Sequence, residues 1–352
     1  MGGSHAAAGR RRAGSGSSPQ PTAVTANSTH GRGVVARPRY VNPRMWLLLA
    51  CAVPPPADVA ETAPVDSGDH PADDTGGAEP TLRFRYVVIA DPHVYDTESD
   101  HLDRLDRAVA WVNNNAEALD LELVLVVGDI CWGTGIDAAR ASLDRLTPTW
   151  VPINGDDEIA GGAEEAYALA FADHYEALST TLDGWVMGPV EVWNPQFETT
   201  SWFHNLAFTW KGVRFVGLDW ASRDPNVILS EMGELHDFEG GTWPFFVEQV
   251  GAAGVAGEDV VMFSHIPMHL SPGGFDLAEM ERVTGVTAPR AEHVWADLAG
   301  HYHGSASETV PDAGYDLHVT DATWDDEVEL RLVEVWANEL RFEPSTELVI
   351  VE

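Results

Sequence analysis

This chain of 352 residues contains one lysine, Lys211, and two cysteines, Cys51 and Cys131. Its net charge is −36 at pH 7, with 56 acidic residues against 20 lysines and arginines. Such acidity argues against a nucleic-acid partner, because binding needs basic side chains that neutralise phosphates. Two cysteines also exclude a framework of several disulfides. We interpret Cys131 as a small packed apolar residue rather than as a ligand or a nucleophile.

The sequence also lacks any run of ~20 apolar residues, the length that a transmembrane helix needs. A shorter apolar run, residues 45–51, follows a basic stretch that ends at Arg44, and this pattern is typical of a secretory signal. Its end, Leu48-Leu49-Ala50-Cys51, resembles the lipobox of bacterial lipoproteins, in which the cysteine is lipidated. The run lies deep in the chain, so a translation start near Val34 is one option. A short buried apolar segment is the alternative interpretation.

Composition divides the chain into three regions. Residues 1–50 hold seven arginines and no acid, and they predict a disordered stretch followed by the signal and lipobox region. Residues 51–81 are rich in Pro, Ala, Asp, Gly and Thr, which predicts an acidic flexible tether. Residues 82–352 read as one α/β domain. A lipid at Cys51 would anchor this domain to a membrane. We therefore expect a protein of the cell envelope, at the outer membrane or facing the periplasm, or a secreted one.

Acidic residues and histidines follow several apolar runs of the third region. They form four clusters: Asp91 with His93, then Asp129, then His265, and finally His301 with His303. Residues 85–90 read as a buried strand, and Pro92 cannot donate to a ladder, so this strand ends at Asp91. Open α/β sheets place ligands at the carboxyl ends of their strands. The clusters therefore predict a two-metal centre.

Apolar periodicity predicts the secondary structure of the domain. Helices are expected at residues 101–118, 136–146, 163–178, 243–253 and 291–298. Strands are expected at residues 85–91, 121–127, 150–153, 201–210, 213–218, 259–263, 315–320, 328–336 and 340–351. A helix between the first two strands implies a parallel βαβ unit. Because the later half is rich in strands, we expect two packed sheets with helices outside.

Residues 154–158, Asn-Gly-Asp-Asp-Glu, complete an ordered series of motifs. The series reads Asp-X-His, Gly-Asp, Gly-Asp-Asp-Glu, His and Gly-His-X-His. It resembles the calcineurin-like metallophosphoesterases over about residues 83–305. The resemblance implies an α/β fold, an αββα sandwich of two mixed sheets with a dinuclear metal centre at the strand ends. It also implies hydrolysis of phosphate mono- or diesters by a hydroxide that bridges the two metals.

The resemblance further implies a role for each cluster. One metal would be bound by Asp91, His93 and His303, the other by Asp156, His265 and His301, and Asp129 would bridge the two. Carboxylate and imidazole ligands suit two divalent or trivalent transition-metal ions such as Mn, Fe or Zn. The substrate would be a small or extracellular phosphate ester. The other histidines considered, which we interpret as structural, are His174, His204, His236 and His293.

The chain departs from the family pattern at Asp157. The family has Gly-Asn-His where this chain has Gly155-Asp156-Asp157, and the family's histidine contacts phosphate and protonates the leaving group. Burial beside an anionic substrate could raise the pKa of Asp157 and leave it a proton to give, so Asp157 is the candidate catalytic residue. In an alternative register Asn154 is the metal ligand. An alternative function is a metal-binding protein with weak or no catalysis.

Overall fold

The computed structural model describes most of the chain beyond residue 80. The described residues are 81–97, 99–225, 232–269, 274–310, 312–325, 327–337, 340–342 and 349–351. All of them belong to one compact unit, Asp74–Glu352. The expected signal, the lipobox cysteine Cys51 and nearly all of the tether lie outside the described residues. Within the part of the chain that the structure describes, no helix combines the length and apolarity needed to cross a membrane.

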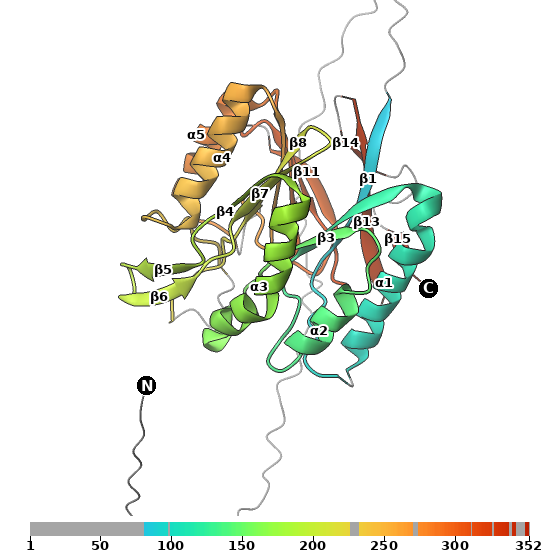
Figure 1. Cartoon of the computed structure of the whole chain (residues 1–352). Coiled ribbons are helices and arrows are strands. Elements are labelled where there is room, and N and C mark those ends of the chain that lie inside the picture. Colours follow the sequence, from blue (N-terminus) through green and yellow to red (C-terminus); the bar gives the residue numbers. More distant parts are fainter. Residues whose placement is uncertain are drawn as a thin grey trace, which may run out of the picture. The chain divides into compact units, whose positions relative to one another are not determined.

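The first of two mixed sheets has the strand order β14-β13-β1-β2-β3, and β15 also pairs with β13 (Figure 1). Its strands are β1 (Leu82–Ile89), β2 (Leu121–Val127), β3 (Thr149–Ile153), β13 (Val328–Trp336), β14 (Leu340–Phe342) and β15 (Val349–Val351). Strands β1, β2 and β3 are parallel, and β13 is antiparallel to β1. The carboxyl ends of β1, β2 and β3 therefore lie at one edge of this sheet.

The second mixed sheet has the order β11-β12-β10-β9-β8-β7-β4. Its strands are β4 (Asp183–Met187), β7 (Leu206–Trp210), β8 (Val213–Leu218), β9 (Asp259–Ser264), β10 (Val294–Ala299), β11 (Ala306–Val310) and β12 (Tyr315–Val319). Strands β8, β9, β10 and β12 are parallel, whereas β4, β7 and β11 run antiparallel to their neighbours. A separate hairpin joins β5 (Glu191–Asn194) to β6 (Thr199–Trp202).

Helices cover the outer faces of the two sheets (Figure 1). They are α1 (Asp100–Leu119), α2 (Ile136–Leu143), α3 (Glu164–Thr181), α4 (Thr242–Ala256) and α5 (Leu277–Thr287), with short 3₁₀ turns η1 (Ala160–Gly162) and η3 (Ala288–Arg290). One buried cluster joins α1, α2 and α3 to the first sheet and to the facing side of the second, where the rings of Tyr86 and Phe215 lie 5.5 Å apart. Another packs α4 and α5 against the second sheet, with Trp220 5.7 Å from Phe246. The layers are thus helices, sheet, sheet and helices, which confirms the predicted αββα sandwich of two mixed sheets.

One predicted helix is wrong. Residues 294–299 form β10, a strand between β9 and β12, rather than part of a helix at 291–298. Because five of the six residues of β10 are buried, its apolar residues do not alternate, and a short run of this kind looks the same as a buried helix. The predicted strand at 201–210 is two strands, β6 and β7. Helix α5 and strands β4, β5 and β11 were not predicted.

Candidate metal centre

Polar side chains from five strand ends meet at one edge of the two sheets. From the first sheet, Asp91 and His93 follow β1, Asp129 follows β2 and Asp156 follows β3; from the second, His265 follows β9, and His301 and His303 follow β10. A backbone hydrogen bond joins the segments that follow β12 and β1 nearby, since Thr323 N donates to Ala90 O at 2.9 Å. The structure brings all seven predicted ligands into two adjacent groups.

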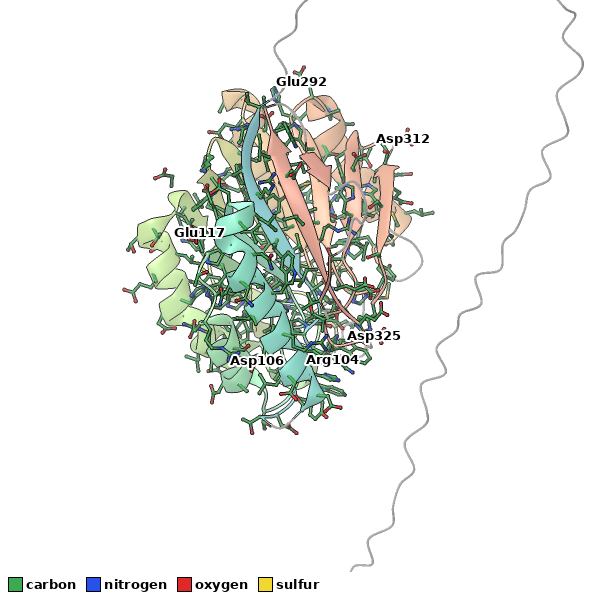
Figure 2. The ribbon with its side chains drawn as sticks, turned by 90° about the vertical axis from the view of Figure 1, so that its right-hand side faces the viewer. Arg104, Asp106, Glu117, Glu292, Asp312 and Asp325 are labelled. Atoms are coloured by element: carbon green, nitrogen blue, oxygen red, sulfur yellow. The ribbon has the colours of Figure 1, made fainter. Side chains whose placement is uncertain are left out.

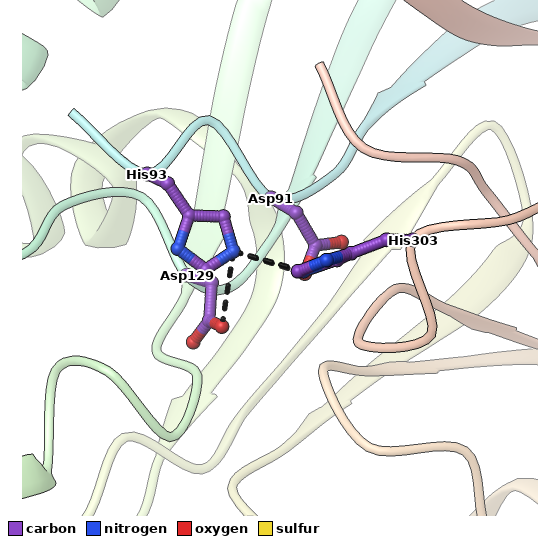
Figure 3. A group of neighbouring side chains, drawn as sticks. All are labelled: Asp91, His93, Asp129 and His303. Atoms are coloured by element: carbon purple, nitrogen blue, oxygen red, sulfur yellow. Dashed lines mark hydrogen bonds and ion pairs between the residues drawn. The ribbon is translucent and has the colours of Figure 1, made fainter. Parts of the chain in front are cut away.

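The first group consists of Asp91, His93, Asp129 and His303, whose potential ligand atoms lie within 4.8 Å of one another (Figure 3). His93 Nε2 lies 3.0 Å from His303 Nε2 and 3.5 Å from Asp129 Oδ2. Asp91 Oδ1 lies 3.7 Å from His93 Nε2 and 3.4 Å from His303 Nε2. Two imidazole nitrogens and two carboxylates thus face a common point, an arrangement that could hold a metal ion.

The second group consists of Asp156, His265 and His301. Asp156 Oδ1 lies 2.9 Å from His265 Nε2 and 3.1 Å from His301 Nδ1. Asp129 Oδ2 lies 3.2 Å from the same His265 nitrogen, so this one oxygen faces both groups. The other oxygen, Oδ1, accepts a hydrogen bond from Asp157 N at 2.9 Å. This arrangement is compatible with a carboxylate that bridges two ions.

The backbone at the centre is unusual. Five of the seven predicted ligands have φ angles between 46° and 73°: Asp91, His93, Asp129, His301 and His303. A residue with a Cβ in this left-handed region costs on the order of 1–2 kcal/mol. Such strain gathers at functional sites, where the surrounding structure holds the chain in place. Here it turns the chain immediately after β1, β2 and β10.

Glycines in two motifs allow the ligands to approach closely. A Cβ at Gly155 would lie 2.1 Å from Asp129 Oδ1, and a Cβ at Gly300 would lie 2.3 Å from Asp91 Oδ2. Neither position has room for a side chain while the carboxylates stay where they are. The glycines of Gly155-Asp156 and Gly300-His301 are thus required by contact with the carboxylates of Asp129 and Asp91.

The loop after β3 is held by the buried Glu158. Its two carboxylate oxygens accept hydrogen bonds from Gly155 N at 2.7 Å and from Cys131 N at 2.8 Å. Cys131 is buried and forms no disulfide. The same loop carries Asp156 into the second group, where its Oδ1 lies 2.9 Å from His265 Nε2 and 3.1 Å from His301 Nδ1, whereas none of the described histidines forms a hydrogen bond with Asn154 Oδ1. The geometry therefore favours the register in which Asp156 is the ligand.

Asp157, which the sequence resemblance aligns with a histidine, lies against His93. Its Oδ2 is 2.6 Å from His93 Nδ1, the ring nitrogen that faces away from His303. Burial raises the pKa of the Asp157 carboxyl, against the opposing effect of His93. Asp157 is thus part of the candidate centre, and its side chain is engaged with one of the predicted ligands.

Charge coupling within the centre is strong. Burial would raise the pKa values of Asp91 and Asp156, but the neighbouring histidines hold both well below the usual range. Burial would lower the pKa values of His93 and His265, but the carboxylates raise both. The buried carboxylates are therefore paired with protonated imidazoles. When such an imidazole loses its proton, its free nitrogen can bind a metal cation. This mixture of oxygen and nitrogen donors fits transition-metal ions.

Trp324 is a neighbour of the centre that the sequence analysis missed. Its ring lies 5.4 Å from that of His303 and 5.8 Å from that of His93, both edge to face. A hydrogen bond from Arg104 of α1 to Trp324 O connects the loop that carries Trp324 to this helix. Figure 2 shows Arg104 and Asp325 at the same end of the molecule. Trp324 follows β12 in a segment without any recognisable motif, so no sequence signal identified it.

The histidines interpreted as structural lie outside both groups. His174 Nε2 donates to Trp150 O at 3.0 Å, and its ring stacks on Trp150 with the centroids 3.8 Å apart. His236 Nε2 donates to Ala221 O at 3.0 Å. His204 is buried beside Tyr167, with the ring centroids 4.8 Å apart. The rings of His174 and His236 form hydrogen bonds within the fold, and the ring of His204 packs against Tyr167.

No family model matches the chain, and no curated protein matches it. Among solved structures, a candidate 5′-nucleotidase from Staphylococcus aureus has a TM-score of 0.47 and 14% identity over 76% of this chain and 54% of its own. TT1561 of Thermus thermophilus has a TM-score of 0.43 and 12% identity, covering 75% and 99%. The sulfate thiohydrolase SoxB of Thermus thermophilus has a TM-score of 0.41 and 12% identity, covering 78% and 57%. The chain spans about half the length of the first of these, 54%.

Proposed function

We propose that this chain is a metal-dependent phosphoesterase that hydrolyses phosphate mono- or diesters. The observation that carries the proposal is the meeting of seven Asp and His side chains from five strand ends in two adjacent groups. The two groups face a common carboxylate oxygen, Asp129 Oδ2. The order of these residues along the chain, which resembles that of the calcineurin-like metallophosphoesterases, supports the same conclusion.

In this proposal the protein's contribution is to hold the ions and the substrate in place. Bound transition-metal ions would make water a better nucleophile and offset charge on the phosphoryl oxygens. Asp91, His93 and His303 would hold one ion, and Asp156, His265 and His301 would hold the other. Asp129 would contribute to both sites, because its Oδ2 faces His93 and His265 while its Oδ1 accepts a hydrogen bond from Asp157 N. No nucleophilic side chain is needed.

Metal reconstitution of the full chain tests the proposal. We expect two ions per chain after incubation with Mn, Fe or Zn, and hydrolysis of 4-nitrophenyl phosphate or bis(4-nitrophenyl) phosphate that depends on them. His265→Ala should lose metal and activity, because His265 Nε2 faces both Asp129 and Asp156. His293→Ala is the matched control, since that histidine lies outside both groups. A wild-type chain that binds no metal would exclude the proposal.

A second function is a metal-binding protein with little or no turnover. The observation that favours it is Asp157, which stands at the position of the family's histidine and contacts His93 instead. Such a protein would take up two ions and bind phosphate esters without releasing alcohol. Stoichiometric metal binding with no hydrolysis of either aryl ester would favour this function over the enzyme.

A further inference from the structure

The two nitrogens of the His93 ring have different neighbours. Nε2 lies 3.0 Å from His303 Nε2 and 3.5 Å from Asp129 Oδ2, within the first group. Nδ1, on the other side of the ring, lies 2.6 Å from Asp157 Oδ2. This separation is shorter than that of an ordinary N–H···O hydrogen bond, as expected when a partner is ionised. The carboxylate of Asp157 therefore contacts Nδ1 of the His93 ring, and the other ligands of the first group lie near Nε2.

The position of Asp157 determines which ring nitrogen can bind a cation. A neutral imidazole has one N–H donor and one lone-pair nitrogen, so a ring that binds metal through Nε2 carries its hydrogen on Nδ1. At His93 that hydrogen would be donated to Asp157 Oδ2. A carboxylate in this position fixes the tautomer and the orientation of the ring, and it makes the ligand nitrogen more basic.

His265 offers a parallel in the second group. Its Nε2 lies 2.9 Å from Asp156 Oδ1, and its Nδ1 lies 2.9 Å from Val127 O. Val127 is the last residue of β2, so the sheet itself holds that carbonyl. Each of the two rings therefore has an acceptor behind it. At His265 the acceptor is a backbone carbonyl, and at His93 it is the side chain of Asp157.

The backbone of Asp157 is fixed independently of its side chain. Its N–H donates to Asp129 Oδ1 at 2.9 Å, and the neighbouring Glu158 anchors the loop through Gly155 N and Cys131 N. The Asp157 residue is only 8% exposed. A change to alanine would thus remove the contact with His93 while the backbone hydrogen bond to Asp129 can remain.

We propose that Asp157 is a positioning residue that holds His93 with its Nδ1 protonated and thereby sets the affinity of the first group for metal. It acts through His93 and does not protonate a leaving group, in contrast to the role expected from the sequence. The inference rests on the proposed function in one respect, namely that the first group binds a metal ion.

Zinc titration of the full chain tests the inference. Asp157→Ala should weaken one of two Zn²⁺ affinities by about 10–100-fold, the usual effect of removing such a partner, and change the other by less than about threefold. Asp157→Asn should stay closer to wild type, because the amide oxygen still accepts from Nδ1–H. The control Asp321→Asn removes a half-buried acid near His303 and should alter neither affinity by more than about threefold.

Equal losses in the Ala and Asn variants would mean that the charge of Asp157 alone matters, which would overturn the inference. Unchanged affinities in both would overturn it too. A wild-type chain that binds no zinc is a different outcome, because it rejects the proposed function itself. If Asp157→Ala fails to fold, Asp157→Leu takes its place, since it fills similar space without an acceptor for His93 Nδ1. A loss of about 10–100-fold in one zinc affinity relative to Asp157→Asn supports the inference, and equal affinities in the two variants overturn it.

A spectroscopic and a kinetic readout complete the test. In the zinc-loaded wild type, NMR should show a far-downfield N–H proton on His93 Nδ1 that disappears in Asp157→Ala. With the loaded protein, Asp157→Asn should slow aryl and alkyl phosphate esters by the same factor, since a positioning residue acts through the metal. A larger loss for the alkyl esters, whose leaving groups need a proton, would show that Asp157 is the acid and overturn the inference.

Discussion

At the scale of single residues, Gly155 shows how tightly the candidate centre is built. A Cβ there would lie 2.1 Å from Asp129 Oδ1, so Gly155→Ala must displace either the loop or the carboxylate that faces both groups. We expect the affinity for both ions to fall by about tenfold or more, which metal titration measures. Gly285→Ala, where a Cβ meets nothing within 4 Å, is the control and should leave metal binding unchanged. Equal affinities in the two variants would contradict this account.

Asp297 on β10 predicts a pH dependence of stability. Burial raises its pKa from 3.8 to about 7, although Met268 N donates to it at 3.2 Å. Between pH 4 and 7 the folded chain keeps a proton on this group that the unfolded chain has already released. Its contribution to the free energy of unfolding therefore falls as pH rises through this window, by a few kcal/mol in order of magnitude.

Chemical denaturation at a series of pH values measures this effect. Asp297→Asn has no ionisable group at this position. As the pH is raised from 4 to 7, the free energy of unfolding of the wild type should therefore fall relative to that of Asp297→Asn. Parallel pH profiles for the two proteins would show that Asp297 ionises normally in the folded state.

At the scale of elements, the N-terminal cap of helix α5 contributes to the stability of the fold. Helix α5 begins with a capping box, in which Asp276 Oδ1 accepts from Glu279 N at 2.9 Å and Glu279 Oε2 accepts from Asp276 N at 3.4 Å. Asp276→Ala should cost about 1 kcal/mol, as measured by urea denaturation. Glu281→Ala, at an exposed position inside the same helix, should change stability by less than about 0.5 kcal/mol. Similar losses in the two variants would argue against the cap.

At the scale of the whole molecule, the acidic chain carries a lipobox-like segment before its α/β domain. We propose that Cys51 is lipidated in a bacterial host and that residues 52–81 tether the domain to a membrane of the cell envelope. Wild-type chain should then appear in the membrane fraction, and Cys51→Ala should move to the soluble fraction. Cys131→Ala, at a buried cysteine, is the control and should stay with the membranes. Identical fractionation of wild type and Cys51→Ala would reject the anchor.

Local patterns in the sequence were enough to predict two packed sheets with helices outside and most of the elements, and the resemblance of the motifs to a known family implied the αββα sandwich. Strand β2 and the hairpin strand β8 have the predicted bounds, because apolar runs that end in turns carry a strong local signal. The sequence also predicted that Asp91, Asp129 and His265 follow strands, since each stands directly after an apolar run. Parallel strands then bring their ends to a common edge. Local chemistry was sufficient for these conclusions.

Which atoms face one another at that edge depends on the tertiary structure. The contact between Asp157 and His93 joins residues 64 positions apart, and its geometry depends on how the loop after β3 is anchored by Glu158. Trp324 reaches His93 and His303 from a loop with no motif. Residues 294–299 became a strand because β9 and β12 flank them in the sheet, a neighbourhood that a six-residue pattern does not encode. Long-range packing, rather than local preference, sets each of these features.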